Sequence, residues 1–575
     1  MPSRLAQLFR KSYIPHSPIL RQAFLSSPRR LIRMPMAHSQ ALQTAASPDL
    51  RTSTRSLEDL QLESSFTSEL PGDPILKNRR RQVEGAFYSY ASPTATNTEP
   101  STVAFSPEVA QIIGLDPEEC RRPEFAAIFS GNAPVPQGVR PYAQNYGGHQ
   151  FGMWAGQLGD GRAISLGQAV GPDGLPYELQ LKGAGETPYS RMADGRAVMR
   201  SSVREFVASE AMHHLGIPTT RALSLVGTGD KVLRDMFYNG NAKYEPGAVV
   251  CRVSPSFVRF GTFQLPAMRG GDQLPLVRTL ADYVIRHLYP HLEGKADNYA
   301  ELLREVVRRT ASLVAQWQAV GFVHGVGNTD NFSILGETID YGPYGFLERF
   351  DPDFTPNTTD LSGRRYTYRN QTMIGHWNSA QLANAFITGG LLDQATAQEI
   401  VDSYADIMTE QYTSRMARKL GLREYRKELA VGLITLMYED KADFTNTFRA
   451  MAAVSADDEP STVPAALDEA LEGLPAERQG AWGKWLDEYR AQLRAEGRSA
   501  EERQREQNSA NPCYVPRNQV MQEAIREAEA GNFQEVKDLM QVLERPFDEQ
   551  PGAEKYRVAA PREVRMGVEL LSCSS

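Results

Sequence analysis

The stretch RAISLGQAVGPDGLPYELQLK, residues 162–182, encodes two strands and the turn between them. Residues 162–170 are rich in apolar side chains, and Gly171-Pro-Asp-Gly174 is a strong turn signal. Residues 177–182 alternate between apolar and polar side chains, as expected of a strand with two different faces. The sequence therefore predicts an antiparallel hairpin that carries Lys182 on its polar face.

Other elements surround this hairpin in a definite order. The segment Gly156-Gln-Leu-Gly159-Asp-Gly161-Arg162 precedes it as a glycine-rich connection. The pattern Ser202-Val-Arg-Glu205 is typical of a capping box at the start of a helix, which Gly216 and Pro218 are expected to end. Further strands are expected at residues 222–226 and 248–253, and helices at 276–288, 299–320, within 377–455 and within 465–550.

This order of features matches the order found in protein kinases. Kinases present a glycine-rich loop over the phosphates, a strand lysine, a helix glutamate, and then an asparagine and an aspartate that hold magnesium. The corresponding residues here are Gly159 and Gly161, Lys182, Glu205, Asn331, and Asp340 in Asp340-Tyr341-Gly342. We therefore predict an α+β, protein-kinase-like fold with two lobes, a β-rich N-lobe and a helical C-lobe, followed by a C-terminal helical extension. The alternative is that Glu205 only caps its helix, Asp340 only starts a turn, and Lys182 is a solvated strand residue.

The candidate catalytic loop departs from the kinase pattern. Val326, two residues after His324, stands where kinases carry their catalytic aspartate, and the nearby carboxylate is Asp330. An amide oxygen from Asn331 and a carboxylate from Asp340 still suit Mg²⁺, which prefers oxygen ligands. The usual base is therefore absent or displaced, which argues against ordinary protein phosphorylation. An ATP-dependent phosphotransferase and a catalytically silent nucleotide-binding pseudokinase scaffold remain as alternatives to any other transferase.

Four longer motifs resemble the selenoprotein O family. They are PYAQNYGGHQFG at 141–152, LKGAGETPYS at 181–190, SEAMHHLGIPTT at 209–220 and NTDN at 328–331. The resemblance runs from about Leu57 to the C-terminus. It implies a kinase-like fold that binds ATP in a flipped orientation and transfers AMP, with release of pyrophosphate, to Ser, Thr or Tyr hydroxyls of protein substrates.

The same resemblance implies roles for individual residues. Asp330 is expected to accept the proton, and Asn331 and Asp340 are expected to bind Mg²⁺. Arg252 and Arg259 look like a pair that binds phosphate. The residues expected to contact ATP are Gly159, Gly161, Arg162, Lys182, Asp194, Gly195, Arg252 and Arg259.

The N-terminal segment has its own composition. Residues 1–48 contain seven basic side chains and no acidic one. The whole chain has a formal net charge of −8, so the residues after 48 carry a net charge of −15. This Arg- and Ser-rich composition is typical of a mitochondrial transit peptide, which we expect over residues 1–50; a disordered basic arm is the alternative. Together with the resemblance, it predicts a mitochondrial protein whose partners are ATP and protein substrates, including redox-related mitochondrial proteins.

The cysteines indicate which branch of the family the chain is expected to belong to. Eukaryotic members of the family often end in selenocysteine before Ser-Ser, and this chain has Cys573 there, which implies a cysteine-containing eukaryotic member. A redox-active Cys573 that bonds to a target, to Cys513 or to Cys251 is therefore expected. No CxxC pair occurs, so a cysteine zinc site is not expected. The histidines His213, His214, His287 and His291 are expected to cap or pack rather than to bind metal.

Charge and hydropathy exclude other function classes. The negative net charge argues against nucleic acid as a partner, and no stretch approaches the roughly 20 apolar residues of a membrane span. Four regions are expected: the leader at 1–50, the N-lobe with a family-specific extension at 57–260, the C-lobe with the catalytic and magnesium loops at 261–455, and a helical extension with a redox tail at 465–575.

Overall fold

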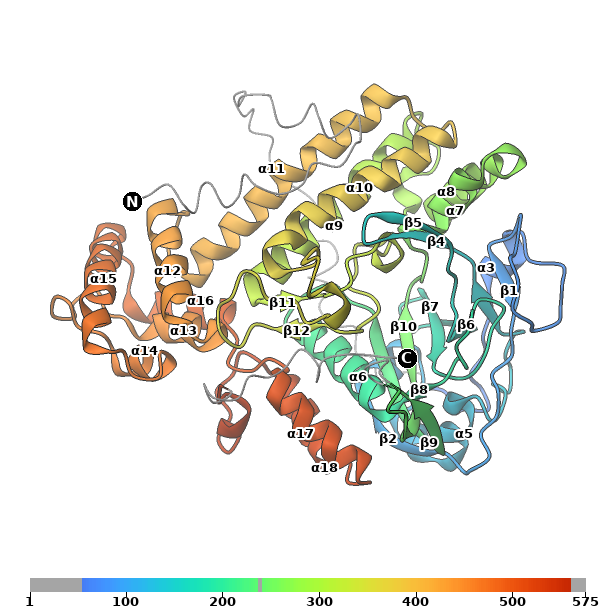
Figure 1. Cartoon of the computed structure of the whole chain (residues 1–575), viewed down its shortest axis with the longest axis horizontal. Helices are drawn as coiled ribbons and strands as arrows, with labels where there is room; N and C mark the ends of the chain where they lie inside the picture. Colours follow the sequence, from blue (N-terminus) through green and yellow to red (C-terminus); the bar gives the residue numbers. More distant parts are fainter. Residues whose placement is uncertain (1–53, 236–239, 560–575) are drawn as a thin grey trace.

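An antiparallel sheet dominates the first half of the molecule, and helices dominate the second half (Figure 1). The structure, a computed structural model, describes residues 54–235 and 240–559. The leader at 1–50 and Cys573 lie outside these residues. The eight sheet strands run in the order β1 (Tyr88–Tyr90), β3 (Tyr142–Gln144), β6 (Ala163–Val170), β7 (Pro176–Lys182), β10 (Lys243–Ser254), β9 (Arg221–Arg234) and β2 (Ser101–Phe105), with β8 (Ala197–Val198) beside β10.

The predicted hairpin is present as β6 and β7. Ala163 pairs with Lys182 and Ile164 pairs with Leu181. The apolar face of β7 packs under α4 (Pro107–Ile112) and α5 (Pro123–Ser130) in one core cluster. The polar face is buried as well, because it forms the wall of a cluster of charged residues rather than a solvent-exposed surface.

The helix that follows, α6, starts earlier than the capping-box pattern predicted. It spans Met199–His214, so Ser202 lies inside its first turn and the prediction of its start was wrong. The reason is tertiary: β8 pairs with β10 and passes the chain directly into the helix at Val198, whose carbonyl accepts a hydrogen bond from the Ser201 hydroxyl. The helix ends as expected, one residue before the turn at Leu215 and Gly216.

A short hairpin, a pair of antiparallel strands and a 3₁₀ turn position the loops between sheet and helices. The hairpin joins β4 (Gly147–Gln150) to β5 (Met153–Gln157), and the pair is β11 (Phe322–Val323) with β12 (Gly345–Phe346), which enclose the loop of Asp330 and Asp340. The turn η4 (Thr329–Asn331) packs against β4 and against the start of α7. These contacts bring the segment 328–331 beside the glycine-rich hairpin.

The helical half has a large apolar core. Buried side chains of α7 (Phe260–Arg269), α8 (Leu274–Leu288), α9 (Asn298–Val320), α10 (Gln371–Thr388) and α11 (Gln394–Lys419) share one cluster. A second cluster joins α12 (Lys427–Asp440) and α13 (Phe444–Ala450) to α14 (Ala465–Ala470) and α15 (Ala476–Glu496), and α16 (Ala500–Ala510) packs on α11.

The last two helices return to the sheet half. α17 (Asn518–Glu529) and α18 (Gln534–Leu543) lie against α6, with Met521, Ile525 and Leu539 in the same buried cluster as Phe206 and Val207 (Figure 1). The C-terminal extension therefore covers the outer face of the helix that carries Glu205. Within residues 54–235 and 240–559, no helix is both long enough and apolar enough to cross a membrane.

Candidate active site

Three cations converge on one carboxylate between the sheet and the helical half. The Nη1 atom of Arg259 lies 2.6 Å from Asp340 Oδ2, Arg252 pairs with Asp340 Oδ1, and Lys182 Nζ lies 3.4 Å from the same oxygen. Glu205 completes the cluster: its carboxylate lies 2.6 Å from Lys182 Nζ and 3.2 Å from Arg252 Nη1. Four of the residues predicted from the sequence, together with Glu205, therefore form one buried ionic network.

The sheet and α6 place these side chains. Lys182 ends β7, and Arg252 stands opposite Gln180 on β10, so both side chains project from neighbouring strands toward α6. Gln180 accepts a hydrogen bond from Arg252, which fixes the guanidinium in place. Alternation along β7 put Gln180 and Lys182 on one face, and this periodicity is the signal by which Gln180 could have been found.

Asp340 has an unusual backbone conformation. Its φ is +61°, in the left-handed region that non-glycine residues seldom occupy. Burial alone would raise the pKa of Asp340, but Arg259, Lys182 and Arg252 hold that pKa well below its ordinary value. The carboxylate is therefore ionised, and the strained backbone aims it at the three cations.

Asp330 is buried, and within residues 54–235 and 240–559 its carboxylate forms no ion pair. Its Oδ2 accepts a hydrogen bond of 3.3 Å from Gln150 Nε2, while its Oδ1 is buried and has no hydrogen-bond partner among the described residues. Burial raises the pKa of Asp330 to about 6. Its backbone carbonyl accepts a hydrogen bond of 2.8 Å from Arg259, so Asp330 is tied to the cluster through its main chain.

Asn331 presents its amide oxygen. Its Nδ2 donates a hydrogen bond of 2.9 Å to the carbonyl of Val326, so the oxygen is the amide atom left for a ligand. His324 is buried and bonds the carbonyl of Ile339 over 2.9 Å, which links the loop of Asn331 to the residue before Asp340. Val326, whose carbonyl accepts the bond from Asn331, carries no carboxylate, so Asp330 stays the candidate base.

Two glycines permit the close approach of the β4–β5 hairpin to Asp330. A side chain at Gly148 would place its Cβ 2.5 Å from Asp330 Oδ1. A Cβ at Gly261, at the start of α7, would overlap the carbonyl of Gly147. Neither Gly148 nor Gln150 was singled out from the sequence, because their contact with Asp330 spans 180 residues and leaves no local pattern.

The glycine-rich loop is fastened to the segment after β7. A Cβ at Gly159 would overlap the ring of Tyr189, and the carbonyl of Gly161 accepts a hydrogen bond from the Ser190 hydroxyl. Between them, Asp160 is buried: it accepts hydrogen bonds from Gln144, Tyr146 and Gln180, and lies 3.9 Å from Arg259 Nη2. The loop therefore contributes a buried carboxylate to the cluster as well as backbone.

Arg162 and Lys182 border a small cavity beneath α6. Ser201, Ser202, Glu205 and Tyr341 form other parts of its wall. The Nη1 atom of Arg162 is buried and has no hydrogen-bond partner among the described residues. An unpaired buried guanidinium nitrogen at this position is suited to an anionic ligand.

Asp194 and Gly195 lie apart from the ionic network. The Asp194 carboxylate, which is 46% exposed, pairs with Arg234 over 2.7 Å. Gly195 has φ +68° and bonds through its carbonyl to the amide of Gly185. Their loop therefore adjoins the segment that follows Lys182, and within the described residues neither forms a hydrogen bond or ion pair with Asp340.

Three cysteines and two histidines of the described chain lie away from the ionic network. Cys120, Cys251 and Cys513 are buried free thiols, and burial raises the pKa of Cys513 to about 11. His287 contacts Glu69 and His291 contacts Glu305, each over 2.9 Å, so the two histidines serve different carboxylates.

Comparison with known proteins gives the family. The family model described as "Protein adenylyltransferase SelO" matches residues 77–544. A protein nucleotidyltransferase YdiU from Xanthomonas campestris pv. campestris (strain 8004) is 50% identical over 524 residues, which cover 90% of this chain and 99% of the relative. Proteins of the same name from Aromatoleum aromaticum and Azoarcus sp. (strain BH72) are each 49% identical, over 532 and 528 residues, and cover 90% of this chain and 100% of the relative.

These relatives correct two predictions. They come from bacteria, so the predictions of a eukaryotic member and of a mitochondrial location were wrong. The error arose because a basic, Ser-rich, acid-poor leader is a compositional signal that does not by itself determine a subcellular location. The bacterial relatives give no support to the transit-peptide interpretation. The match over nearly the whole chain shows that this protein belongs to the SelO family of protein adenylyltransferases and is a protein nucleotidyltransferase.

Proposed function

We propose that this chain transfers AMP from ATP to Ser, Thr or Tyr hydroxyls of protein substrates on a two-lobed, protein-kinase-like fold. Residues 57–260 would form the N-lobe, 261–455 the C-lobe and 465–575 the extension. The observation that carries the proposal is the convergence of Lys182, Arg252 and Arg259 on Asp340 beside the buried Asp330. Nucleotidyl transfer needs cations for a triphosphate and a carboxylate for the acceptor proton.

The cations would bind the phosphates. Arg252 and Arg259 offer planar guanidinium groups that match phosphate oxygens in pairs, and Lys182 supplies a point charge held by Glu205. Both arginines are almost fully buried, so their charges act at low local dielectric and are little screened by salt. They would stabilise the negative charge that develops on the leaving pyrophosphate.

A divalent cation fits the neighbouring oxygen atoms. Asn331 and Asp340 would hold Mg²⁺ through an amide oxygen and a carboxylate, the donor types that this hard ion prefers. The fit rests on two observations: the Asn331 amide nitrogen is already bonded to Val326, and Asp340 is ionised. When bound, Mg²⁺ neutralises phosphate charge and orients the triphosphate.

Asp330 would take the acceptor proton. Its Oδ1 has no other hydrogen-bond partner in the described chain, and above about pH 6 its carboxylate is ionised. The substrate hydroxyl gives its proton to Asp330 as its oxygen bonds to the α-phosphorus. The bond between that phosphorus and the oxygen leading to the β-phosphate breaks, and the electron pair leaves with pyrophosphate.

The remaining predicted contacts complete a nucleotide site. Arg162, with its unpaired Nη1, would bind an anionic group of the nucleotide in the cavity next to Lys182. Gly159 and Gly161 would approach the nucleotide through their backbone, since side chains there would overlap Tyr189. Asp194 and Gly195 would reach it only from the exposed loop beside Gly185.

Labelled ATP tests the proposal. The full chain is incubated with Mg²⁺, a protein acceptor, and ATP labelled at either the α- or the γ-phosphate. Label is expected on protein only from the α position, and Asp330→Asn is expected to abolish it. The matched control is Asp538→Asn on α18, remote from the cluster in sequence and packing, which should transfer label as wild type does. Label from the γ position alone would contradict the proposal.

A further inference from the structure

A second group of ligand-type side chains lies at the other end of α6. Nε2 of His213 lies 3.3 Å from Oε1 of Glu108, and Nε2 of His214 lies 3.8 Å from Oε2 of Glu108. One ligand atom from each of the three residues lies within 4.8 Å of those of the other two. We propose that Glu108, His213 and His214 bind a divalent transition-metal ion such as Zn²⁺, at a site separate from the active site.

The ligand types and spacing suit zinc rather than magnesium. Zinc accepts imidazole nitrogen and carboxylate oxygen at about 2.0–2.2 Å, which places tetrahedral ligands about 3.3 Å apart. The distance from His213 Nε2 to Glu108 Oε1 already has this value, and His214 Nε2 lies 3.8 Å from the other carboxylate oxygen, Oε2. Magnesium prefers oxygen ligands, so two imidazoles disfavour it.

The surrounding charges favour a cation. Arg221 is the positive neighbour: its Nη2 lies 3.2 Å from Glu108 Oε2. Its Nε and Nη2, however, donate to both oxygens of Glu210 over 2.9 and 2.8 Å, so Glu210 balances most of its charge and leaves Oε1 of Glu108 for another ion. Glu544 adds negative charge nearby: burial and the charges of Glu108 and Glu210 raise its pKa, while the charge of Arg545 lowers it.

The two histidines also sit where a helix favours positive charge. His213 and His214 are the last residues of α6, and the C-terminal end of a helix carries a partial negative charge. Metal binding requires neutral imidazoles and an ionised carboxylate, so Zn²⁺ would displace any proton that His213 or His214 carries.

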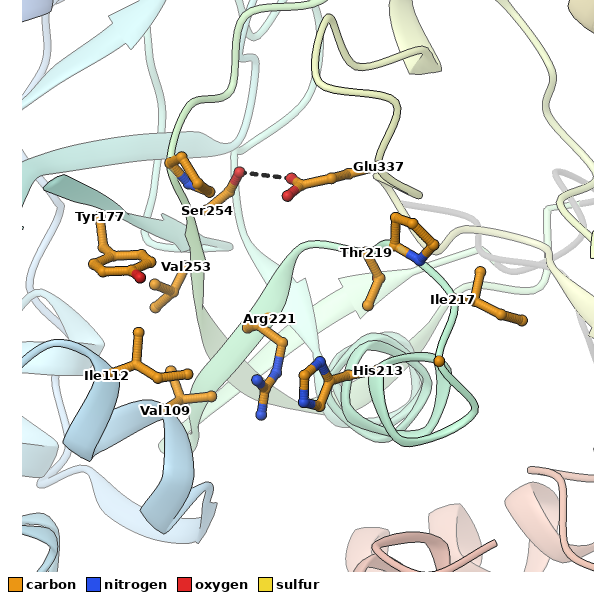
Figure 2. Close-up of a pocket in the computed structure, with 13 residues that line it drawn as sticks. Val109, Ile112, Tyr177, His213, Ile217, Thr219, Arg221, Val253, Ser254 and Glu337 are labelled. Carbon is orange, nitrogen blue, oxygen red and sulfur yellow. Dashed lines mark hydrogen bonds between the residues drawn. The ribbon is translucent and has the colours of Figure 1, made fainter. Parts of the chain in front are cut away.

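The cluster is accessible and has room for a further ligand. The side chains of Glu108 and His213 are 47% and 40% exposed. His213 also borders a cavity of about 350 Å³, and Figure 2 shows it beside Arg221 at one end, with the Ser254–Glu337 hydrogen bond across the cavity. A three-ligand zinc site with a water in the open fourth position fits this setting.

The site would fasten two elements of the N-terminal half together. Glu108 is in the first turn of α4, and His213 and His214 end α6, nine residues or about 13 Å of helix beyond Glu205. Zinc would thus anchor the far end of the helix whose Glu205 holds Lys182. The alternative is that Glu108 only forms ion pairs with Arg221 and a protonated His213.

Calorimetric titration with Zn²⁺ tests the site. The full chain, without a histidine tag and cleared of metal with a chelator, is titrated in excess Mg²⁺ so that Asn331 and Asp340 do not compete. One equivalent of Zn²⁺ should bind and raise the thermal midpoint. His214→Ala and Glu108→Gln should each weaken Zn²⁺ binding by more than about tenfold. His291→Ala, a half-exposed histidine paired with Glu305, is the control and should bind as wild type does.

Cobalt provides a readout that does not depend on stability. Co²⁺ in the site should give visible absorption bands of a four- or five-coordinate ion, and these bands should be lost in His213→Gln even if His214→Ala does not fold. Two results would overturn the proposal: a wild-type chain that binds no Zn²⁺ under these conditions, or histidine variants that bind Zn²⁺ with unchanged stoichiometry and affinity. Both results concern metal binding alone and leave the proposed nucleotidyl transfer untested, since none of the three residues belongs to the active-site network.

Discussion

Replacing Asp330 with asparagine should separate catalysis from stability. Asparagine keeps the size of the side chain but carries no charge, and Gln150 can turn its amide to bond it. Burial raises the pKa of Asp330 from 3.8 to about 6. A shift of about two units corresponds to about 3 kcal/mol of free energy that the native state spends on ionising this carboxylate at neutral pH.

The sign of the effect follows from proton linkage. Because the pKa of Asp330 is raised in the native state, its protonated form stabilises the fold. This contribution to the free energy of unfolding is fully present below pH 3.8 and is lost as the pH rises through about 6. Asp330→Asn should therefore raise the thermal midpoint at pH 7.5, by an amount that shrinks as the pH falls below 6. Wild-type transfer should decline about tenfold per pH unit below about 6, since the base becomes protonated.

Turnover and stability are measured on the same preparations. Single-turnover transfer from α-labelled ATP at pH 7.5 should fall by about 10²–10⁴-fold in Asp330→Asn, the usual loss when a general base is removed. ATP binding by calorimetry should stay within a few-fold of wild type. A variant that transfers AMP at the wild-type rate would refute the role of Asp330. A stability gain that is the same at pH 5 and pH 7.5 would refute the raised pKa.

Three other substitutions follow from the same geometry. Asp340→Ala should nearly abolish Mg²⁺-dependent transfer, while Asn331→Ala, which removes a neutral ligand, should be milder; wild-type activity and Mg²⁺ dependence in Asp340→Ala would contradict the metal assignment. Glu205→Gln removes the negative charge that lies 2.6 Å from Lys182 Nζ, and should lower kcat/KM for ATP at least tenfold. An unchanged kcat/KM would mean that the ion pair serves only the fold. Gly148→Ala should displace Asp330, because its Cβ would lie 2.5 Å from Oδ1, and should lower transfer more than tenfold in a folded protein; Gly480→Ala on α15, with nothing within 4 Å of its Cβ, is the control, and equal rates in both variants would contradict the close packing.

Sequence patterns predicted the parts of the site that local periodicity and order determine. The alternation along 177–182 located Lys182 on a strand, and the order of features located Glu205 and Asp340, which the structure brings into one network. Alternation alone does not show whether the polar face of that strand, which includes Gln180 and Lys182, is buried or exposed. Its burial depends on α6 and on Asp340, which arrive from far along the chain.

Other parts depend on tertiary contacts that leave no local signal. The bond between Gln150 and Asp330 links residues 180 positions apart, and Asp160 is buried only because Tyr146, Gln144 and Gln180 surround it. The capping-box pattern at Ser202 misplaced the start of α6 because strand pairing at Ala197–Val198 overrode it. The pairing of Asp194 with Arg234 likewise depends on a strand 40 residues away.

If this site transfers the nucleotidyl part of ATP, the mass of the acceptor protein must change by that group. Casein and the enzyme's own chain are analysed by intact-mass spectrometry after incubation with unlabelled ATP and Mg²⁺. We expect an added mass equal to one adenylyl group (AMP less water), with equimolar pyrophosphate released, and no added mass with Asp330→Asn. An added mass equal to one phosphate, or an AMP adduct that persists at full yield in Asp330→Asn, would contradict it.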